Sequence, residues 1–190
     1  MPRSGIVTAV ILLTTVLAAP MLHAAEVAGV RIEEQAKAGG TDLVLNGAGV
    51  RTKLFFKVYA AALYAPKKTT NAATLIDSRE PRRIVMHMLR DLDADSLFSA
   101  LLEGLRGNQN ESELAKLKPD IDQFEHLMRG IGNAKTGDVI SIDFGNGVGV
   151  GFNGQLRGNV GGEAFARALI KVWLGDKPAD AGLKQDLLGG

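Results

Sequence analysis

The chain has 190 residues, of which 46% are apolar and 23% charged, and 22 basic against 21 acidic side chains give a formal net charge of +1. This length suits one domain with a substantial core, and the ordinary charged fraction argues against disorder. Because no basic surplus is available for phosphates, generic nucleic-acid binding is not expected. The absence of cysteine from the sequence excludes thiol catalysis, disulfides, thiolate zinc sites and iron–sulfur clusters.

The first 24 residues have the pattern of a secretory signal peptide. Arg3 provides a positive start, the uncharged run from Ile6 to Ala19 follows, and a small residue at Ala24 suits cleavage. That run falls short of the roughly 20 residues that a membrane-spanning helix needs. We therefore expect cleavage after Ala24 or Ala25, no stable membrane anchor afterwards, and a mature domain over residues 25–190 in the periplasm of a bacterium.

Strands are predicted through most of the first half of the mature chain. Val27 to Ala36 forms the first, a Gly39-Gly40 turn follows, and Thr41 to Val50 comes next. Leu54 to Ala65 is almost continuously apolar, which is typical of a strand covered on both faces. The remaining elements of this half are a short helix and a further strand, over Asn71 to Ser78 and Arg82 to Leu92.

The second half changes to helical spacing. After a cap at Asp93 or Asp95, apolar residues from Leu97 to Leu105 recur three and four apart. A second helical stretch follows, from Leu114 to Ile131, with a kink or restart expected at Pro119. The last elements are two strands of a hairpin and a helix, over Val139 to Phe144, Val148 to Leu156 and Gly162 to Leu174. This order predicts an α+β domain with a mainly antiparallel sheet.

Three motifs match functional patterns only in part. Gly149 to Gly154 has the spacing of a dinucleotide-binding fingerprint, but it lies inside a strand-like run rather than directly before a helix. His87 and His126, the histidines of the mature chain, match no metal-binding spacing, so we expect no metal and no cofactor. The alternating aspartates from Asp91 to Asp95 lack the glycine and glutamate of a calcium loop, and they fit helix capping instead.

The segment from Asn46 to Tyr64 carries the most informative polar residues. Arg51 follows a pair of glycines at the entrance to an apolar strand, and a buried arginine needs an anion that its planar group can bind. Tyr59, inside that strand, brings a hydroxyl that needs a partner when buried. On the residues alone, two interpretations stay open. One is a pocket for an acid headgroup and an apolar tail; the other is an arginine paired with a nearby acid and a tyrosine in the core.

These residues resemble the chalcone isomerase superfamily, in particular its secreted bacterial branch. The matching features are Asn46 to Arg51, Phe56 to Tyr64, Met86 to Leu92 and Phe165 to Gly175, and the order of strands and helices also agrees. The resemblance implies an open-faced β-sandwich, in which helices pack over one face of a large, mainly antiparallel sheet above a cleft. The superfamily contains chalcone-cyclising enzymes, fatty-acid-binding proteins and non-catalytic helper proteins.

The resemblance also assigns roles to particular residues. In the enzymes an arginine holds the substrate with threonine, tyrosine and asparagine side chains, and only the arginine carries over, as Arg51. Tyr59 stands at the threonine position, as in the fatty-acid binders, while Leu97 and Gly104 stand near the helix tyrosine and asparagine. The resemblance thus implies that Arg51 binds a carboxylate and that Tyr59 donates a second hydrogen bond. The cleft-lining candidates are Phe55, Phe56, Leu97, Phe98 and Leu101.

The function expected from this comparison is binding of a fatty acid or a similar small amphiphilic carboxylate, without catalysis, so no catalytic residue is assigned. One alternative is an isomerase, an intramolecular lyase acting on a polyphenol-like substrate with Arg51 as electrophile. The other is a protein-interaction module with a vestigial cleft. The sequence sets no oligomeric state.

Overall fold

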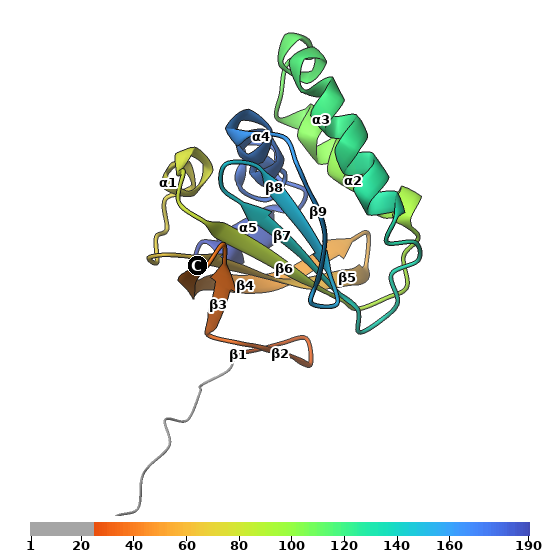
Figure 1. Cartoon of the computed structure of the whole chain (residues 1–190). Coiled ribbons are helices and arrows are strands. Elements are labelled where there is room, and N and C mark those ends of the chain that lie inside the picture. The colour runs from red at the N-terminus through yellow and green to blue at the C-terminus, as the bar shows by residue number, and fades with distance from the viewer. Residues whose placement is uncertain (1–24) are drawn as a thin grey trace, which may run out of the picture.

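The computed structural model describes residues 25–190, so the predicted signal peptide lies outside the described residues. A seven-stranded antiparallel sheet dominates the fold, and strands that are consecutive in the chain are neighbours in space. These strands are β3 (Gln35–Ala38), β4 (Thr41–Lys53), β5 (Phe56–Ala65), β6 (Arg82–Met88), β7 (Val139–Phe144), β8 (Val148–Phe152) and β9 (Gln155–Val160). A separate hairpin of β1 (Ala25–Val27) and β2 (Val30–Ile32) precedes the sheet (Figure 1).

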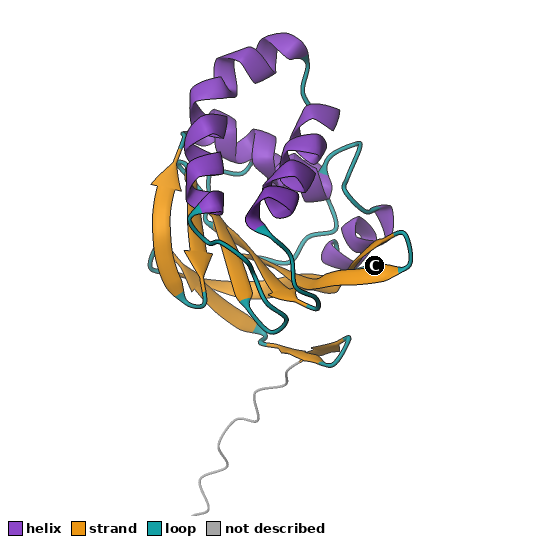
Figure 2. Cartoon of the chain, turned by 90° about the vertical axis from the view of Figure 1, so that its right-hand side faces the viewer, coloured by secondary structure: helices purple, strands orange, loops and turns teal. Residues whose placement is uncertain are grey.

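Within residues 25–190, five helices accompany the sheet and gather on one of its faces (Figure 2). They are α1 (Ala72–Asp77), α2 (Ala94–Gly107), α3 (Glu111–Arg129), α4 (Glu163–Leu174) and α5 (Ala181–Leu187). Four begin at a side chain that accepts from a backbone N–H of the first turn, namely Asn71, Asp93, Asn110 and Asp180. The predicted α+β architecture is confirmed. Within residues 25–190, no helix has both the length and the apolar character needed to cross a membrane.

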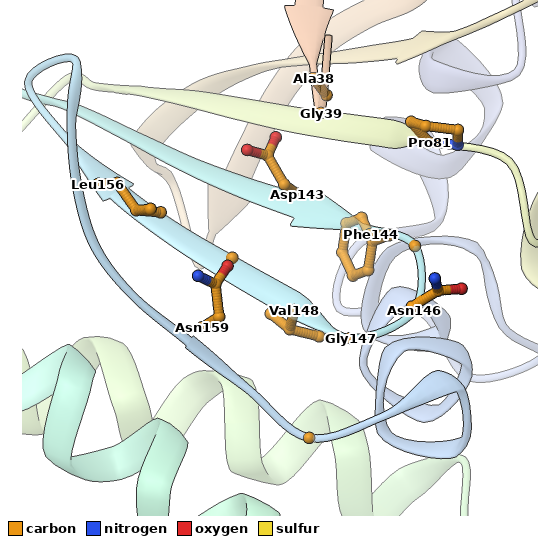
Figure 3. A pocket seen from close by; sticks show the side chains of 13 residues that line it. Ala38, Gly39, Pro81, Asp143, Phe144, Asn146, Gly147, Val148, Leu156 and Asn159 are labelled. Atoms are coloured by element: carbon orange, nitrogen blue, oxygen red, sulfur yellow. The ribbon is translucent and has the colours of Figure 1, made fainter. Parts of the chain in front are cut away.

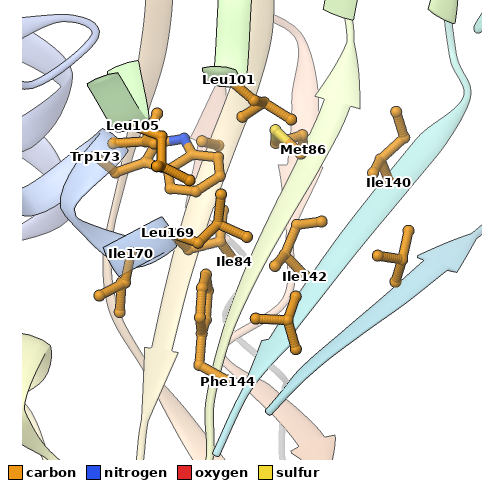
Figure 4. Packing of buried hydrophobic residues seen from close by; sticks show 14 of the residues in the cluster. Ile84, Met86, Leu101, Leu105, Ile140, Ile142, Phe144, Leu169, Ile170 and Trp173 are labelled. Carbon is orange, nitrogen blue, oxygen red and sulfur yellow. The ribbon is translucent and has the colours of Figure 1, made fainter. Parts of the chain in front are cut away.

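The main core fills the space between the sheet and its helices. Figure 4 shows Trp173 and Leu169 of α4 and Leu101 of α2 above Met86 and Ile142 of the sheet. A smaller cluster on the opposite face surrounds β5 with residues of β2, β3 and β4. Because both faces of β5 are covered, all its residues from Val58 to Ala65 are buried, as its apolar sequence predicts.

Turns divide two of the predicted strands and shorten a third. The first predicted strand, from Val27 to Ala36, is interrupted by a turn at Ala28 and Gly29, which have φ angles of 52° and 80°. The residues after this turn form two short strands, β2 and β3. The run that was predicted from Leu54 starts two residues later, because Leu54 has a φ of 52° in the turn between β4 and β5. The predicted strand from Val148 to Leu156 breaks into β8 and β9 at Asn153-Gly154, where both φ angles are positive.

The helical half also differs from the prediction at two places. α3 continues through Pro119, where a kink or restart was expected. Pro119 is exposed, and so is Ala115, whose carbonyl loses its helical partner; water can therefore satisfy that carbonyl. α5 was not predicted, because its seven residues include only two buried leucines, Leu183 and Leu187.

Candidate ligand-binding site

The glycine-rich stretch of β4 lies directly beneath α5. The Asn46 amide donates to the carbonyls of Leu187 (2.7 Å) and Thr69 (3.1 Å) and accepts from the Thr69 N–H (2.7 Å), which fastens the C-terminal end of α5 to the strand. A Cβ atom on Gly47 or Gly49 would collide with Asp186, so only glycine lets the helix approach this closely. The stretch thereby places α5 over the strand that carries Arg51.

Arg51 and Tyr59 face each other across one rung of the β4–β5 ladder, so both side chains lie on the helix-covered face of the sheet. Arg51 is 8% exposed and Tyr59 2% exposed. The guanidinium carbon lies 5.7 Å from the centroid of the tyrosine ring. From α4, the indole N–H of Trp173 donates to the Tyr59 hydroxyl at 3.1 Å. Three elements thus bring an arginine, a tyrosine and a tryptophan together in the interior.

This pair contains hydrogen-bond donors without acceptors. The Nε atom of Arg51 is buried and has no hydrogen-bond partner. Within residues 25–190, the Tyr59 hydroxyl accepts from Trp173 but has no partner to which it donates. The nearby carboxylate of Asp180 is already engaged, because it accepts from the backbone N–H groups of Thr52 and Leu183, each at 3.0 Å. An incoming anion would therefore find two donors side by side.

Burial raises the pKa of the Tyr59 hydroxyl, because the phenolate would be desolvated. The positive charge of Arg51, the hydrogen bond from Trp173 and a hydrogen-bonding contact with Arg51 act in the opposite direction, and the negative charge of Asp180 reinforces the rise. The net shift is upward from the ordinary tyrosine value. The Tyr59 hydroxyl therefore keeps its proton at physiological pH and is available to donate it.

Arg82 shows what a buried structural arginine looks like in the same fold. It is 1% exposed and donates from Nη1 to the carbonyls of Leu75 and Ile76 at the end of α1, although its Nε atom, like that of Arg51, has no hydrogen-bond partner. Burial and the nearby charge of Arg167 lower the pKa of Arg82 to about 10. Its role is to cap a helix, whereas Arg51 meets no such group of carbonyls.

The structure separates the predicted lining residues into two groups. Leu97, Phe98 and Leu101 of α2 are buried in the main core. Phe55 and Phe56, in contrast, are 97% and 60% exposed, so the expectation that they line the cleft is wrong. Both residues lie at the turn between β4 and β5, outside the core that fills the space between the sheet and the helices.

Leu97 and Gly104, which stand near the helix tyrosine and asparagine of the isomerases, offer no polar side chain here. Leu97 packs in the core, and a Cβ atom on Gly104 would lie 2.8 Å from the Val172 side chain. The absence of a side chain at Gly104 therefore lets α2 approach α4 closely. Within the described residues, no three histidine or acidic side chains are grouped to hold a metal ion.

The other motifs singled out in the sequence have structural roles. Asp93 caps α2 by accepting from the Ser96 N–H at 2.7 Å, and Asp91 binds Lys135 and Thr136. The stretch from Gly149 to Gly154 lies in β8 and its turn and is followed by another strand. Helix capping is thus confirmed for Asp93, whereas Asp91 binds Lys135 and Thr136 instead of capping a helix, and no helix N-terminus lies at the glycines.

Three hollows on the surface of the described residues do not include the Arg51–Tyr59 pair. One hollow, of about 520 Å³, lies by the β7–β8 turn, where Asp143, Val148 and Asn159 line it (Figure 3). Its carboxylate, from Asp143, is already paired with Arg83 at 2.8 Å. This hollow, a second between α3 and α4 and a third between α2 and α3 include neither Arg51 nor Tyr59. A ligand tail entering beside the pair would therefore displace interior side chains.

A large antiparallel sheet with helices on one face, and a buried arginine–tyrosine pair on its β4–β5 hairpin, define a protein of the chalcone isomerase fold. The chain belongs to the chalcone isomerase-like family, whose sequence profile matches residues 24–189. No curated protein matches the sequence.

Among solved structures, the chain is similar to a crystal structure of a fatty-acid binding protein from Arabidopsis thaliana, with a TM-score of 0.66 and 17% sequence identity. The similarity covers 84% of this chain and 92% of the plant protein. It confirms the fold that the sequence motifs predict.

Proposed function

We propose that this protein binds a fatty acid or a similar amphiphilic carboxylate and does not catalyse a reaction on it. The observation that carries the proposal is the buried pair of donors, Arg51 Nε and the Tyr59 hydroxyl, which lack an acceptor. A buried polar group left unpaired costs about 1–3 kcal/mol. A carboxylate would accept from both groups and remove that cost. The fatty-acid binding named for the similar plant structure supports the same ligand class.

The apolar tail would extend from this pair between the sheet and α2. Met88 lies opposite Tyr59 on the neighbouring strand, and Met86 packs below Leu101 of α2 (Figure 4). Methionine side chains are unbranched and adapt to irregular shapes, so they can yield to a tail more readily than branched residues. Ala61, on the same face of β5 as Tyr59, adds little bulk beside this route. The tail would take the place of side-chain volume beneath Leu97, Phe98 and Leu101.

The proposal is tested by calorimetric titration with saturated fatty acids, using Tyr59→Phe and a matched control, Tyr64→Phe. Both tyrosines are buried on β5, but the Tyr64 hydroxyl lies on the opposite face and donates to the Glu33 carbonyl at 2.8 Å. Loss of one hydrogen bond to the carboxylate should weaken binding about 10–150-fold in Tyr59→Phe and leave Tyr64→Phe unchanged. Failure of the unmodified protein to bind any fatty acid would overturn the proposal.

A spectrophotometric assay of chalcone cyclisation tests the isomerase alternative. The expected rate equals that in buffer, because neither Leu97 nor Gly104 supplies a hydroxyl or amide to hold water or a ketone. Rapid turnover that disappears in Arg51→Ala would instead establish an enzyme.

Export to the periplasm is also part of the proposal and rests on the signal-like first 24 residues. N-terminal sequencing of protein isolated from a bacterial periplasmic fraction should give Ala25 or Glu26 as the first residue. An N-terminus at Met1 in protein that stays in the cytoplasm would contradict it.

A further inference from the structure

The β4–β5 hairpin ends in a surface that packing does not explain. Leu54, Phe55 and Phe56 are consecutive, and they are 78%, 97% and 60% exposed. Among the described residues, the other large apolar side chain with high exposure is Leu156, at 63%. Scattered exposed apolar side chains are ordinary, but three in succession on one turn form a patch.

The backbone conformation of this turn makes a leucine at position 54 unusual. Leu54 has a φ of 52°, in the left-handed region that favours glycine, asparagine or aspartate. A leucine there costs free energy, and its exposed side chain gains nothing from packing. Stability and solubility would both favour a polar turn residue at this position. The strain and the exposure therefore point to a function of the side chains themselves.

Three cations surround the patch. Lys53 and Lys57 flank it in the sequence, and the guanidinium of Arg90 lies 5.0 Å from the centroid of the Phe56 ring. All three are exposed. Within residues 25–190, none of them forms an ion pair, although other surface lysines and arginines do. The hairpin tip thus combines exposed apolar side chains with three cations that form no ion pair among the described residues.

We propose that this tip, residues 53–57 with Arg90, docks reversibly on the surface of an anionic phospholipid bilayer. Leucine and phenylalanine side chains insert at the headgroup boundary, and basic side chains around them bind anionic headgroups. Two phenylalanine side chains of about 150–250 Å² each, together with one leucine, offer less area than the roughly 800 Å² per partner of a standard protein interface. Both the size and the charge of the patch therefore favour a lipid surface over a protein partner.

The tip lies close to the proposed carboxylate site. The Arg51–Tyr59 rung is followed along the ladder by Thr52–Lys57 and Lys53–Phe56, and then by the turn. In Figure 1 this turn lies at the opposite end of β5 from α1. Docking of the tip would hold the end of the sheet that carries Arg51 near the bilayer, where amphiphilic carboxylates dissolve. That consequence rests on the proposed function, whereas the docking itself does not.

Co-sedimentation with phosphatidylcholine vesicles, with and without phosphatidylglycerol, tests the proposal. The unmodified protein should bind the vesicles that contain phosphatidylglycerol, and added salt should weaken this binding. Leu54→Asn/Phe55→Ser should abolish it with an unchanged or higher thermal midpoint, because asparagine tolerates the left-handed turn. Lys53→Gln/Lys57→Gln should weaken it about 25-fold, since each cation near an anionic surface contributes a factor of about five.

Two control variants separate the hairpin tip from the rest of the surface. Lys67→Gln/Lys68→Gln removes the same charge from exposed lysines just beyond the other end of β5, and Leu156→Ser removes an exposed apolar side chain from β9. Both should bind vesicles like the unmodified protein. Equal losses in the controls and the tip variants would overturn the proposal, as would an unmodified protein that stays in solution with both kinds of vesicle.

Light scattering with size-exclusion chromatography tests the competing occupant, a second copy of this chain. A dimer that the tip substitutions convert to a monomer, with vesicle binding unaffected, would assign the patch to self-association and overturn the proposal. Failure of docking remains distinguishable from failure of fatty-acid binding. Arg51→Met should still bind vesicles, and the tip variants should keep their affinity for a soluble fatty acid in vesicle-free titrations.

Discussion

Replacing Arg51 by methionine should change stability and ligand affinity in opposite directions. The substitution keeps a long, flexible side chain in the same space but removes the charge and the Nε donor that has no partner in the folded protein. If Arg51 served the fold, as Arg82 does through its bonds to α1, its loss would destabilise the protein. If Arg51 instead serves to bind a ligand carboxylate, its loss should stabilise the ligand-free protein.

The magnitudes follow from the contacts of Arg51. Relieving an unpaired buried donor stabilises by about 1–3 kcal/mol, and the lost contact with the Tyr59 ring at 5.7 Å offsets about 0.5–1 kcal/mol of this. The net gain is about 1 kcal/mol, or about 2–4 °C in Tm for a domain of this size. Loss of a charge-assisted hydrogen bond to the carboxylate should cost about 1.5–3 kcal/mol, which weakens binding about 10–150-fold.

The two effects together predict a reversal of stability order on adding ligand. At a fatty-acid concentration 100 times its Kd, the unmodified protein should gain about 2.7 kcal/mol, and a variant with a Kd about thirtyfold higher should gain about 1 kcal/mol. Urea unfolding with and without fatty acid measures both gains, and calorimetry measures the affinities. Arg51→Lys should recover part of the lost affinity, because an ammonium lacks the planar fork. Destabilisation in Arg51→Met with unchanged affinity would refute the reasoning.

Three further substitutions or ligand series test the fold and the pocket. Gly49→Ala should destabilise by about 1–3 kcal/mol in urea unfolding, because its Cβ would collide with Asp186 and displace α5; an unchanged midpoint would contradict this packing. Burial raises the pKa of Tyr64 to about 12, so its stabilising contribution is complete below pH 10 and is lost as the pH rises to about 12. Alkaline unfolding curves should therefore be shallower over this range for Tyr64→Phe, and curves parallel to the unmodified protein would exclude the effect. Affinity should rise by about 0.8 kcal/mol per methylene of a fatty acid until the space is full, and Phe98→Ala should move the optimum to longer chains; flat affinity across the series would indicate headgroup contact alone.

Much of the fold follows from local patterns. The alternation of burial along β6 and β7 matches the period of a strand with one covered face, and the apolar run of β5 matches one with two. The spacing of apolar residues from Leu97 to Leu105 likewise predicts α2, with Asp93 at its cap. These signals are reliable here because burial on a sheet or helix face constrains residue type at every second, third or fourth position.

The missed turns have physical reasons. Asn153-Gly154 is a strong hairpin signal, but Gly149 and Gly151 before it gave the stretch the spacing of a nucleotide-binding motif and concealed the turn. Leu54 carries no turn signal at all, because its positive φ contradicts the preference of its side chain. Phe55 and Phe56 were predicted to line the cleft because apolar residues are expected in the interior. At this turn that expectation fails, since both side chains are exposed.

The candidate site depends on contacts between residues far apart in the chain. The sequence places Arg51 and Tyr59 on consecutive strands, but only the register sets them opposite each other, and only α4 and α5 complete their surroundings. Gly47 and Gly49 allow this arrangement, because the absence of their side chains leaves space for α5, whose N-cap is Asp180.

Asp180 in turn holds the backbone of Thr52, the residue after Arg51, at 3.0 Å. Both oxygens of its carboxylate accept from backbone N–H groups, so its charge lies near the site without pairing with the guanidinium of Arg51. A neighbouring acid was the ordinary alternative to a ligand for this arginine. Because Asp180 caps α5 instead, its carboxylate does not pair with Arg51, and the proposed external anion would supply that partner.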